Sequence, residues 1–254
     1  IRLSLVGSEM CIRDRCTHIA IVLAGGRGSR MKSSVPKQYL LLNGKPVLYY
    51  SLKAMEDSFI DAVILVCGAG EDGYCKKELI DKYNLKKVCS IVQGGKERYD
   101  SVYNGLKEIA RLEIADEDAY VYIHDGARPC VAAELLNECK TNVEVYGACV
   151  PAVPVKDTIK IVDSYGFSAD TPKRSSLMVV QTPQCFRFID ALKAYSDMEN
   201  AAAGGADISD ITDDAMVVER FAGIRVKLCK GSYNNIKVTT PEDIVTLENM
   251  LRIK

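Results

Sequence analysis

A glycine-rich loop flanked by cations, within residues 19–37 (IAIVLAGGRGSRMKSSVPK), is the stretch of this sequence best suited to chemistry. The apolar, β-branched run Ile19–Leu23 is typical of a strand buried on both faces of a parallel sheet. Three glycines follow Ala24: Gly25, Gly26 and Gly28. Because glycine lacks a Cβ, their backbone N–H groups can approach an anion closely. Four cations lie in or beside the loop: Arg27, Arg30, Lys32 and Lys37. We therefore expect a site for a highly charged phosphate chain rather than a simple glycine turn.

The loop matches neither of two common phosphate motifs. A Walker A loop needs Gly-Lys-Ser/Thr, but here Lys32-Ser33 follows Met31. A dinucleotide fingerprint needs G-x-G-x-x-G, and Met31 stands where its third glycine belongs. The sequence thus predicts a different loop, in which side-chain cations add to the backbone donors, and it disfavours a dehydrogenase.

Three later segments carry further candidate ligands. Gly94-Gly95 could bring backbone groups to the edge of a planar ligand, with Ser101 one helical turn beyond Arg98, although Gly-Gly is also an ordinary strand–helix connector. In HDGARP, Asp125 follows an apolar run, where a carboxylate can hold Mg²⁺ beside phosphates or simply cap a helix. Lys237 precedes the last predicted helix, and its alternative is an exposed lysine at a strand end.

Alternating strand and helix patterns must position these residues. Strands are expected at Ile19–Leu23, Ala62–Cys67, Val88–Val92, Tyr120–Ile123, Ala148–Ala152 and Arg225–Leu228, and helices at Val47–Glu56, Arg98–Ala110, Glu134–Val145 and Pro241–Leu251. This order predicts an α/β fold with a mostly parallel sheet, helices on both faces, and ligands beyond the carboxyl ends of the strands. The alternating segment Asp157–Asp163 and the turn Tyr165-Gly166 favour a projecting β-arm over about 155–178, or else a surface loop.

Composition limits the classes of partner and compartment. The net charge is −1 over 254 residues, which provides no global basic field for nucleic acid or an anionic membrane. No apolar run approaches the roughly 18 residues of a membrane span. The ten cysteines form no C-x-x-C pair, and there are two histidines, so we expect buried free thiols in a reducing cytoplasm.

The chain divides into a short first segment and one expected domain. Residues 1–15 lack an initial methionine and a secretory pattern and resemble translated sequencing-adapter sequence, so we expect a non-native extension. Residues 16–254 show no repeat or low-complexity linker, and we expect a single domain there.

The ordered set of motifs resembles the 2-C-methyl-D-erythritol 4-phosphate cytidylyltransferase family of the non-mevalonate isoprenoid pathway. Its members in this chain are AGGRGSRM, PKQY, GGKERYDSV, HDGARP, VPVKDTIK, QTPQ, TDDA and NIKVTTPED, from about Ile19 to Leu251. The resemblance implies a Rossmann-like nucleotidyltransferase fold and a homodimer in which the arm of one subunit completes the other's site. Two departures are Gly126, where alanine is commoner, and Lys96, where an acidic residue is frequent.

The same resemblance assigns roles to individual residues. It implies that Arg30 and Lys37 stabilise the transition state, that Arg174, Lys237, Thr158 and Thr182 position the substrate, and that Asp125 lies near the metal. The nucleotide-binding residues it implies are Ala24, Gly25, Gly26, Gly28, Gly95, Ser101, Asp125 and Arg128.

The implied reaction is transfer of CMP from CTP to methylerythritol phosphate, by in-line attack on the α-phosphorus with Mg²⁺ or another divalent cation. One alternative is a cytidylyltransferase for a pentitol phosphate such as ribitol 5-phosphate, which has a similar loop and QTPQ segment. The other is a nucleotide-binding regulatory protein without turnover, against which the full set of cations argues.

Overall fold

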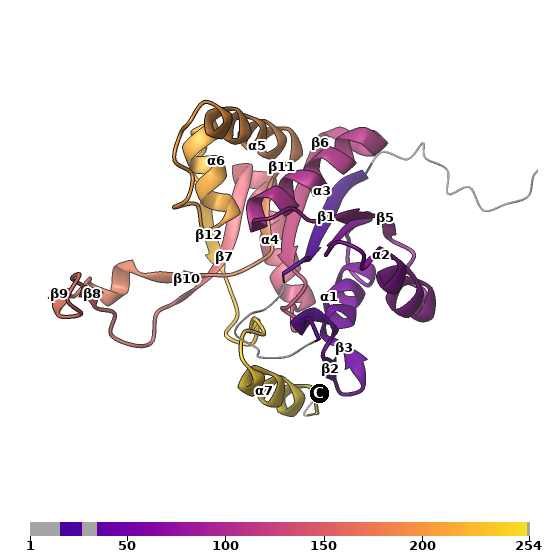
Figure 1. Ribbon diagram of the computed structural model, residues 1–254, viewed down its shortest axis with the longest axis horizontal. Helices are drawn as coiled ribbons and strands as arrows, with labels where there is room; N and C mark the ends of the chain where they lie inside the picture. The colour runs from indigo at the N-terminus through magenta and orange to yellow at the C-terminus, as the bar shows by residue number, and fades with distance from the viewer. Residues whose placement is uncertain (1–15, 27–34, 253–254) are drawn as a thin grey trace, which may run out of the picture.

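The computed structural model describes residues 16–26 and 35–252, which form a twisted sheet covered by helices (Figure 1). Within this part of the chain one sheet has the order β10-β7-β11-β6-β1-β4-β5, and β12 pairs with β7. The strands are β1 (Cys16–Ala24), β4 (Ala62–Cys67), β5 (Val88–Gln93), β6 (Ala115–Asp125), β7 (Ala148–Pro154), β10 (Met178–Val180), β11 (Gln184–Arg187) and β12 (Lys227–Lys230). Strands β6, β1, β4 and β5 are parallel, whereas β11 is antiparallel to both β6 and β7.

The central strands are apolar on both faces because each face meets a separate layer of helices. In β1, Ala20 and Val22 point into one core while Ile19 and Ile21 point into the other, as the period of two requires. The first core also contains α1 (Val47–Glu56), α4 (Ala133–Tyr146) and the π-helical segment η3 (Cys75–Asp81), which follows the short α2 (Asp72–Tyr74). The second contains α3 (Arg98–Leu112), α5 (Phe188–Ala203) and α6 (Asp214–Ala222). Each buried leucine or isoleucine contributes roughly 1.5–3 kcal/mol.

A third, smaller hydrophobic cluster lies at the end of the sheet that carries the candidate site residues. Helix α7 (Pro241–Arg252) contributes Leu247, which packs with Leu42 of the hairpin β2 (Leu41–Leu42) and β3 (Lys45–Pro46). Ala127 and Val238 belong to the same cluster. The HDGARP turn and the segment before α7 are therefore packed together, although they lie far apart in the sequence.

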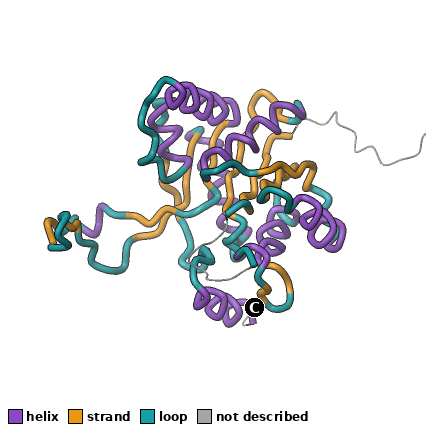
Figure 2. Tube along the Cα trace, in the orientation of Figure 1, coloured by secondary structure: helices purple, strands orange, loops and turns teal. Residues whose placement is uncertain are grey.

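A β-arm projects from the body of the molecule between β7 and β10 (Figures 1 and 2). Its hairpin consists of β8 (Ile161–Val162) and β9 (Ser168–Asp170), and the one-turn 3₁₀ helix η4 (Arg174–Ser176) follows. Gly166 has φ 85°, a backbone conformation that favours glycine in a tight turn. The predicted arm is present, with a shorter hairpin than the alternating segment Asp157–Asp163 suggested.

The structure confirms the predicted α/β fold and corrects the bounds of several elements; β6, for example, is Ala115–Asp125 rather than Tyr120–Ile123. The bounds of β4 and α1 agree with the sequence prediction, whereas the last strand is Lys227–Lys230 rather than Arg225–Leu228. Helix α5 and strands β10 and β11 were not predicted. Six of the described cysteines are buried thiols: Cys67, Cys75, Cys139, Cys149, Cys185 and Cys229. Among the described helices, none is both long and apolar enough to cross a bilayer.

Candidate active site

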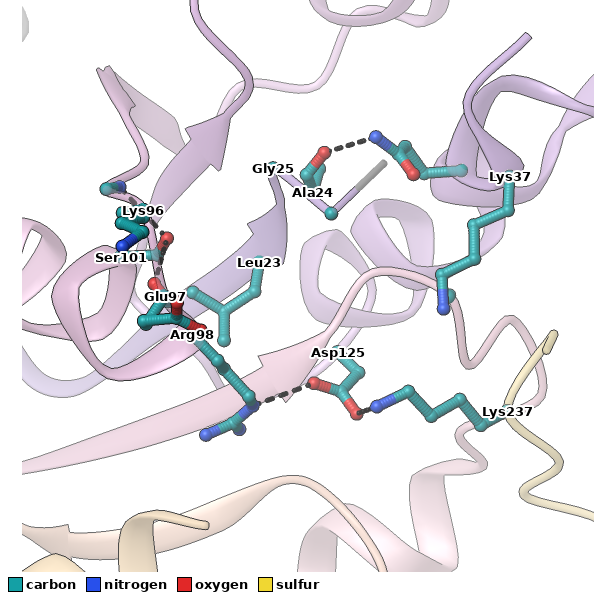
Figure 3. Close-up of a pocket in the computed structure, with 14 residues that line it drawn as sticks. Leu23, Ala24, Gly25, Lys37, Lys96, Glu97, Arg98, Ser101, Asp125 and Lys237 are labelled. Carbon is teal, nitrogen blue, oxygen red and sulfur yellow. Dashed lines mark hydrogen bonds and ion pairs between the residues drawn. The ribbon is translucent and has the colours of Figure 1, made fainter. Parts of the chain in front are cut away.

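A pocket lies at the carboxyl ends of the parallel strands, where the fold predicts ligand binding (Figure 3). Gly25 comes directly after β1, Gly95 is the second residue after β5, and Asp125 is the last residue of β6, so the carboxyl ends of three strands contribute to one edge. Of the residues predicted from sequence, eight line this pocket: Ala24, Gly25, Gly26, Lys37, Gly95, Ser101, Asp125 and Lys237. Gly28 and Arg30 lie outside the described residues.

Asp125 is the electrostatic centre of the pocket. Its Oδ2 lies 2.8 Å from Lys237 Nζ and 3.7 Å from Arg128 Nε, and its Oδ1 lies 3.4 Å from Arg98 Nε. Burial by itself would raise the pKa of this carboxyl, but Arg98, Lys237 and Arg128 together hold the pKa well below its usual range. Asp125 is therefore a carboxylate at any physiological pH, and two of its cationic neighbours, Arg98 and Lys237, also line the pocket.

A buried hydroxyl holds the backbone at Asp125 in place. Thr182 is 4% exposed, and its Oγ1 accepts a hydrogen bond of 3.1 Å from the Asp125 backbone N–H. The same oxygen lies 3.1 Å from Nδ1 of His124, whose Nε2 lies 3.2 Å from the Arg128 carbonyl oxygen. Burial lowers the pKa of His124 to about 4, so the ring is neutral at pH 7. Since a carbonyl only accepts, Nε2 carries the proton and Thr182 donates to Nδ1.

The glycine pair after β5 forms a turn that has no room for side chains. A Cβ on Gly95 would lie 2.2 Å from Asp100 Cβ, and one on Gly94 would lie 2.8 Å from Ser101 Oγ. The Ser101 hydroxyl accepts from the Gly95 N–H at 3.1 Å and donates to the Glu97 carbonyl at 3.2 Å. The N–H groups of both glycines are bonded within the protein, that of Gly94 to the Cys67 carbonyl at 2.8 Å, and the absence of a Cβ lets a planar ligand approach the Gly95 backbone closely.

Lys37 enters the same pocket from the 3₁₀ helix η2 (Lys37–Tyr39), on the side opposite Lys96 and Ser101 (Figure 3). The neighbouring side chains fix this short helix. Gln38 Nε2 donates to the Ala24 carbonyl at 2.5 Å, which ties the helix to the end of β1. Tyr39 OH donates to Glu71 Oε2 at 2.7 Å. The helix that carries Lys37 is therefore held by the end of β1, through Ala24, and by the segment after β4, through Glu71.

Four predicted residues lie outside the lining of the pocket. Thr182 is behind Asp125, and Arg128 donates from Nη1 to the Asn235 carbonyl at 2.7 Å. Thr158 and Arg174 are on the arm, where Arg174 Nη1 donates to the Lys156 carbonyl at 2.7 Å. The pocket of one chain therefore contains neither of the two arm residues.

A buried ion pair beside the pocket joins two residues that have no role predicted from the sequence. Arg98 donates from Nη1 and Nη2 to the two oxygens of Asp214, at 2.6 and 2.7 Å. Asp214 is fully buried and also accepts from Tyr195 OH at 2.5 Å. Both residues stand in motifs already noted, GGKER and TDDA, but nothing in their spacing indicates that they meet.

The acidic groups of the pocket suit a cation that arrives with a phosphate chain. In the described part of the chain, no group of three or more His, Cys, Asp or Glu residues could enclose a metal ion. Asp125 supplies a single carboxylate, and Mg²⁺ is typically bound by one or two carboxylates together with substrate phosphates. The donor set therefore fits Mg²⁺ bound jointly with a ligand.

A cation-lined pocket at this edge of a parallel sheet suits the phosphates of a nucleotide, and the family of this chain makes it a nucleotidyltransferase. The sequence model of one protein family matches residues 18–253, and that family is described as 2-C-methyl-D-erythritol 4-phosphate cytidylyltransferase. The chain belongs to this family, as the motifs predicted.

Named relatives agree with this membership. The cytidylyltransferase of Lachnospira eligens is 48% identical over 228 residues, covering 89% of this chain and 95% of the relative. That of Lachnoclostridium phytofermentans is 47% identical over 233 residues, covering 92% and 95%. A solved 4-diphosphocytidyl-2C-methyl-D-erythritol synthase superposes with a TM-score of 0.75 at 28% identity, covering 93% of this chain and all of that one. The enzyme of Anaerococcus prevotii gives 0.75 at 30% identity, covering 92% and 96%.

Proposed function

We propose that this chain transfers CMP from CTP to 2-C-methyl-D-erythritol 4-phosphate, forming 4-diphosphocytidyl-2-C-methyl-D-erythritol and pyrophosphate. The observation that carries the proposal is the meeting of Lys37, Lys237 and Asp125 in the pocket beside Gly25 and Gly95. The family and its relatives support this reaction, and none of them favours the pentitol phosphate or the non-catalytic alternative.

The chemistry requires charge stabilisation rather than a proton acceptor. A phosphate oxygen of the acceptor attacks the α-phosphorus of CTP, and the bond from that phosphorus to the bridging oxygen of pyrophosphate breaks. The attacking phosphate is already an anion near neutral pH, so no general base is needed. Lys37, and Arg30 by the family resemblance, would stabilise the charge that develops on the α-phosphate and the leaving group. Lys237 would hold the attacking phosphate in line.

Asp125 would hold the divalent cation, which when bound neutralises phosphate charge and orients the triphosphate. Asp125 is suited to this role because its backbone is anchored by Thr182, and because its Oδ1 has only the loose contact of 3.4 Å with Arg98 Nε in the described structure. At the other end of the pocket, the Gly95 backbone and the turn that Ser101 stabilises would receive the cytosine edge.

We further propose a homodimer in which the arm of one subunit completes the site of the other. The arm exposes large apolar side chains: Val162 at 62%, Tyr165 at 86% and Phe167 at 72%. Such exposure on a projecting hairpin is typical of a surface that packs against a partner. The distance of Thr158 and Arg174 from their own pocket is then explained, because both would act in the partner's site. A cytoplasmic location is proposed from the buried thiols.

Pyrophosphate release tests the reaction directly. CTP is offered with methylerythritol phosphate and with ribitol 5-phosphate in parallel, and we expect release with the first. Lys37→Ala and Arg30→Ala should each lower kcat by about 10²–10³ with little change in CTP binding. Lys193→Ala, which removes an exposed lysine paired with Asp197 on α5, is the matched control and should retain full turnover. Faster release with ribitol 5-phosphate, or wild-type turnover in both pocket variants, would contradict the proposal.

Mixed dimers test the arm. Lys37→Ala and Arg174→Ala damage different parts of the proposed composite site, so a random mixture of the two inactive variants contains heterodimers with one intact site. Half of the dimers are mixed and one of two sites is intact in each, which predicts recovery of about a quarter of wild-type activity. Absence of any recovery, in a mixture shown to exchange subunits, would refute the arrangement.

A further inference from the structure

The buried ion pair between Arg98 and Asp214 connects the pocket to a helix that does not line it. Arg98 is the first residue of α3 and lines the pocket, whereas Asp214 is the first residue of α6. The side chain of Asp214 is 0% exposed and that of Arg98 is 30% exposed. The contact is therefore made inside the protein, and only part of the guanidinium reaches the pocket.

The geometry of this pair determines which nitrogen of Arg98 faces Asp125. Both terminal nitrogens are engaged by Asp214, at 2.6 and 2.7 Å, in the two-pronged arrangement that is the strongest for arginine and a carboxylate. Only Nε is directed to Asp125, and its distance from Oδ1 is 3.4 Å. Tyr195 OH adds a third donor to Asp214, which orients the carboxylate further. Arg98 is thus bound firmly to Asp214 and loosely to Asp125.

We infer that Asp214 is a positioning residue for the nucleotide site, which keeps the Arg98 guanidinium from forming a two-pronged pair with Asp125. The inference rests on the proposed function, in which Asp125 holds a divalent cation with the triphosphate. Asp125 is the other carboxylate within reach of Arg98 in the described structure. If Asp214 is made neutral, the terminal nitrogens lose their anion, and Asp125 becomes the partner that satisfies them.

Two opposite effects on ligand binding follow. A guanidinium paired to Asp125 through two hydrogen bonds occupies the oxygens that a cation would use, so coupling between Mg²⁺ and CTP should weaken. Removing the negative charge of Asp214 also leaves one more uncompensated positive charge beside the pocket, which attracts a free triphosphate. General loss of structure would weaken both kinds of binding, and the two explanations can therefore be separated.

The test is calorimetric titration of the full-length chain with CTP, in the presence and absence of Mg²⁺. The dissociation constant of CTP without Mg²⁺, divided by that with Mg²⁺, measures the coupling between the two ligands. In Asp214→Asn we expect this ratio to fall by about 10- to 100-fold, the usual cost of disturbing a residue behind a metal ligand, with metal-free CTP bound as tightly as by wild type or more tightly. Asp213→Asn is the matched control, because asparagine can still cap α6 and the residue lies outside the pocket lining.

A second variant keeps the inference refutable if Asp214→Asn fails to fold. Asp214→Glu retains the carboxylate that binds the terminal nitrogens of Arg98, and so we expect the coupling to stay within about threefold of wild type. A tenfold loss in Asp214→Glu, or coupling in Asp214→Asn equal to that of Asp213→Asn, would overturn the inference while pyrophosphate release by wild type still supported the function. If wild type released no pyrophosphate with either acceptor, the proposed function would fail and the inference with it.

Discussion

Replacing Thr182 by valine should destabilise the protein although the two side chains have nearly the same shape. The hydroxyl accepts from the Asp125 backbone N–H and lies 3.1 Å from His124 Nδ1, to which it donates. Valine fills the same volume but offers neither an acceptor nor a donor. Both partners are buried, His124 completely, so water does not replace the lost hydroxyl.

The magnitude follows from counting the polar groups left without a partner. An unsatisfied buried donor or acceptor costs about 1–3 kcal/mol, so the two together should lower the free energy of unfolding by about 2–6 kcal/mol. Thr182→Ser keeps the hydroxyl and removes one methyl group, for which about 1 kcal/mol is expected. The serine variant is therefore the control that separates the hydrogen bonds from packing.

Urea unfolding followed by far-ultraviolet circular dichroism measures both variants at pH 7.5. Stability is the appropriate measurement, because a direct contact between this hydroxyl and the substrate would lower activity without changing the stability of the free protein. If the valine variant unfolds with a free energy within about 0.5 kcal/mol of the serine variant, the hydroxyl does not hold the backbone at Asp125, and the reasoning is refuted.

Two other predictions concern the same end of β6. The pKa of His124 is lowered to about 4 in the fold, so the unfolded chain binds more protons between pH 6.5 and 4, and stability should fall by up to about 3 kcal/mol as pH drops through that window. His124→Gln, whose amide can still donate to the Arg128 carbonyl, should lose less stability than wild type over the same range of pH. If the urea midpoint of this variant depends on pH as that of wild type does, His124 is not the source of the pH dependence. Gly126→Ala places a Cβ 2.7 Å from Leu48 Cδ1 and 2.9 Å from the Leu23 carbonyl oxygen, and should cost about 1–3 kcal/mol. Gly73→Ala, where a Cβ meets nothing within 4 Å, is the control, and equal melting temperatures of the two variants would count against this packing argument.

The local hydrophobic pattern was sufficient to predict an element where that element is long and its ends are clear in the sequence. The apolar run of β4 and the amphipathic pattern of α1 allowed both elements to be predicted with their observed ends. The pattern was insufficient for β10 and β11, which are short antiparallel strands: β11 lies between β6 and β7, and β10 pairs with the other side of β7. Their place in the sheet depends on pairing with strands that are distant in sequence, and that information is not local.

For the site, the sequence by itself determined which residue types follow the carboxyl ends of the strands: the glycines after β1 and β5, and the carboxylate at the end of β6. Parallel strands bring such positions to one edge, so a phosphate pocket could be predicted from the order of the elements. Only the tertiary structure decided how the charges pair. Lys237 meets Asp125, and Asp214 meets Arg98, across 112 and 116 positions of the chain. A charge pair depends on distances of a few ångströms, and these are set by how the helices pack on the sheet, which no local pattern specifies.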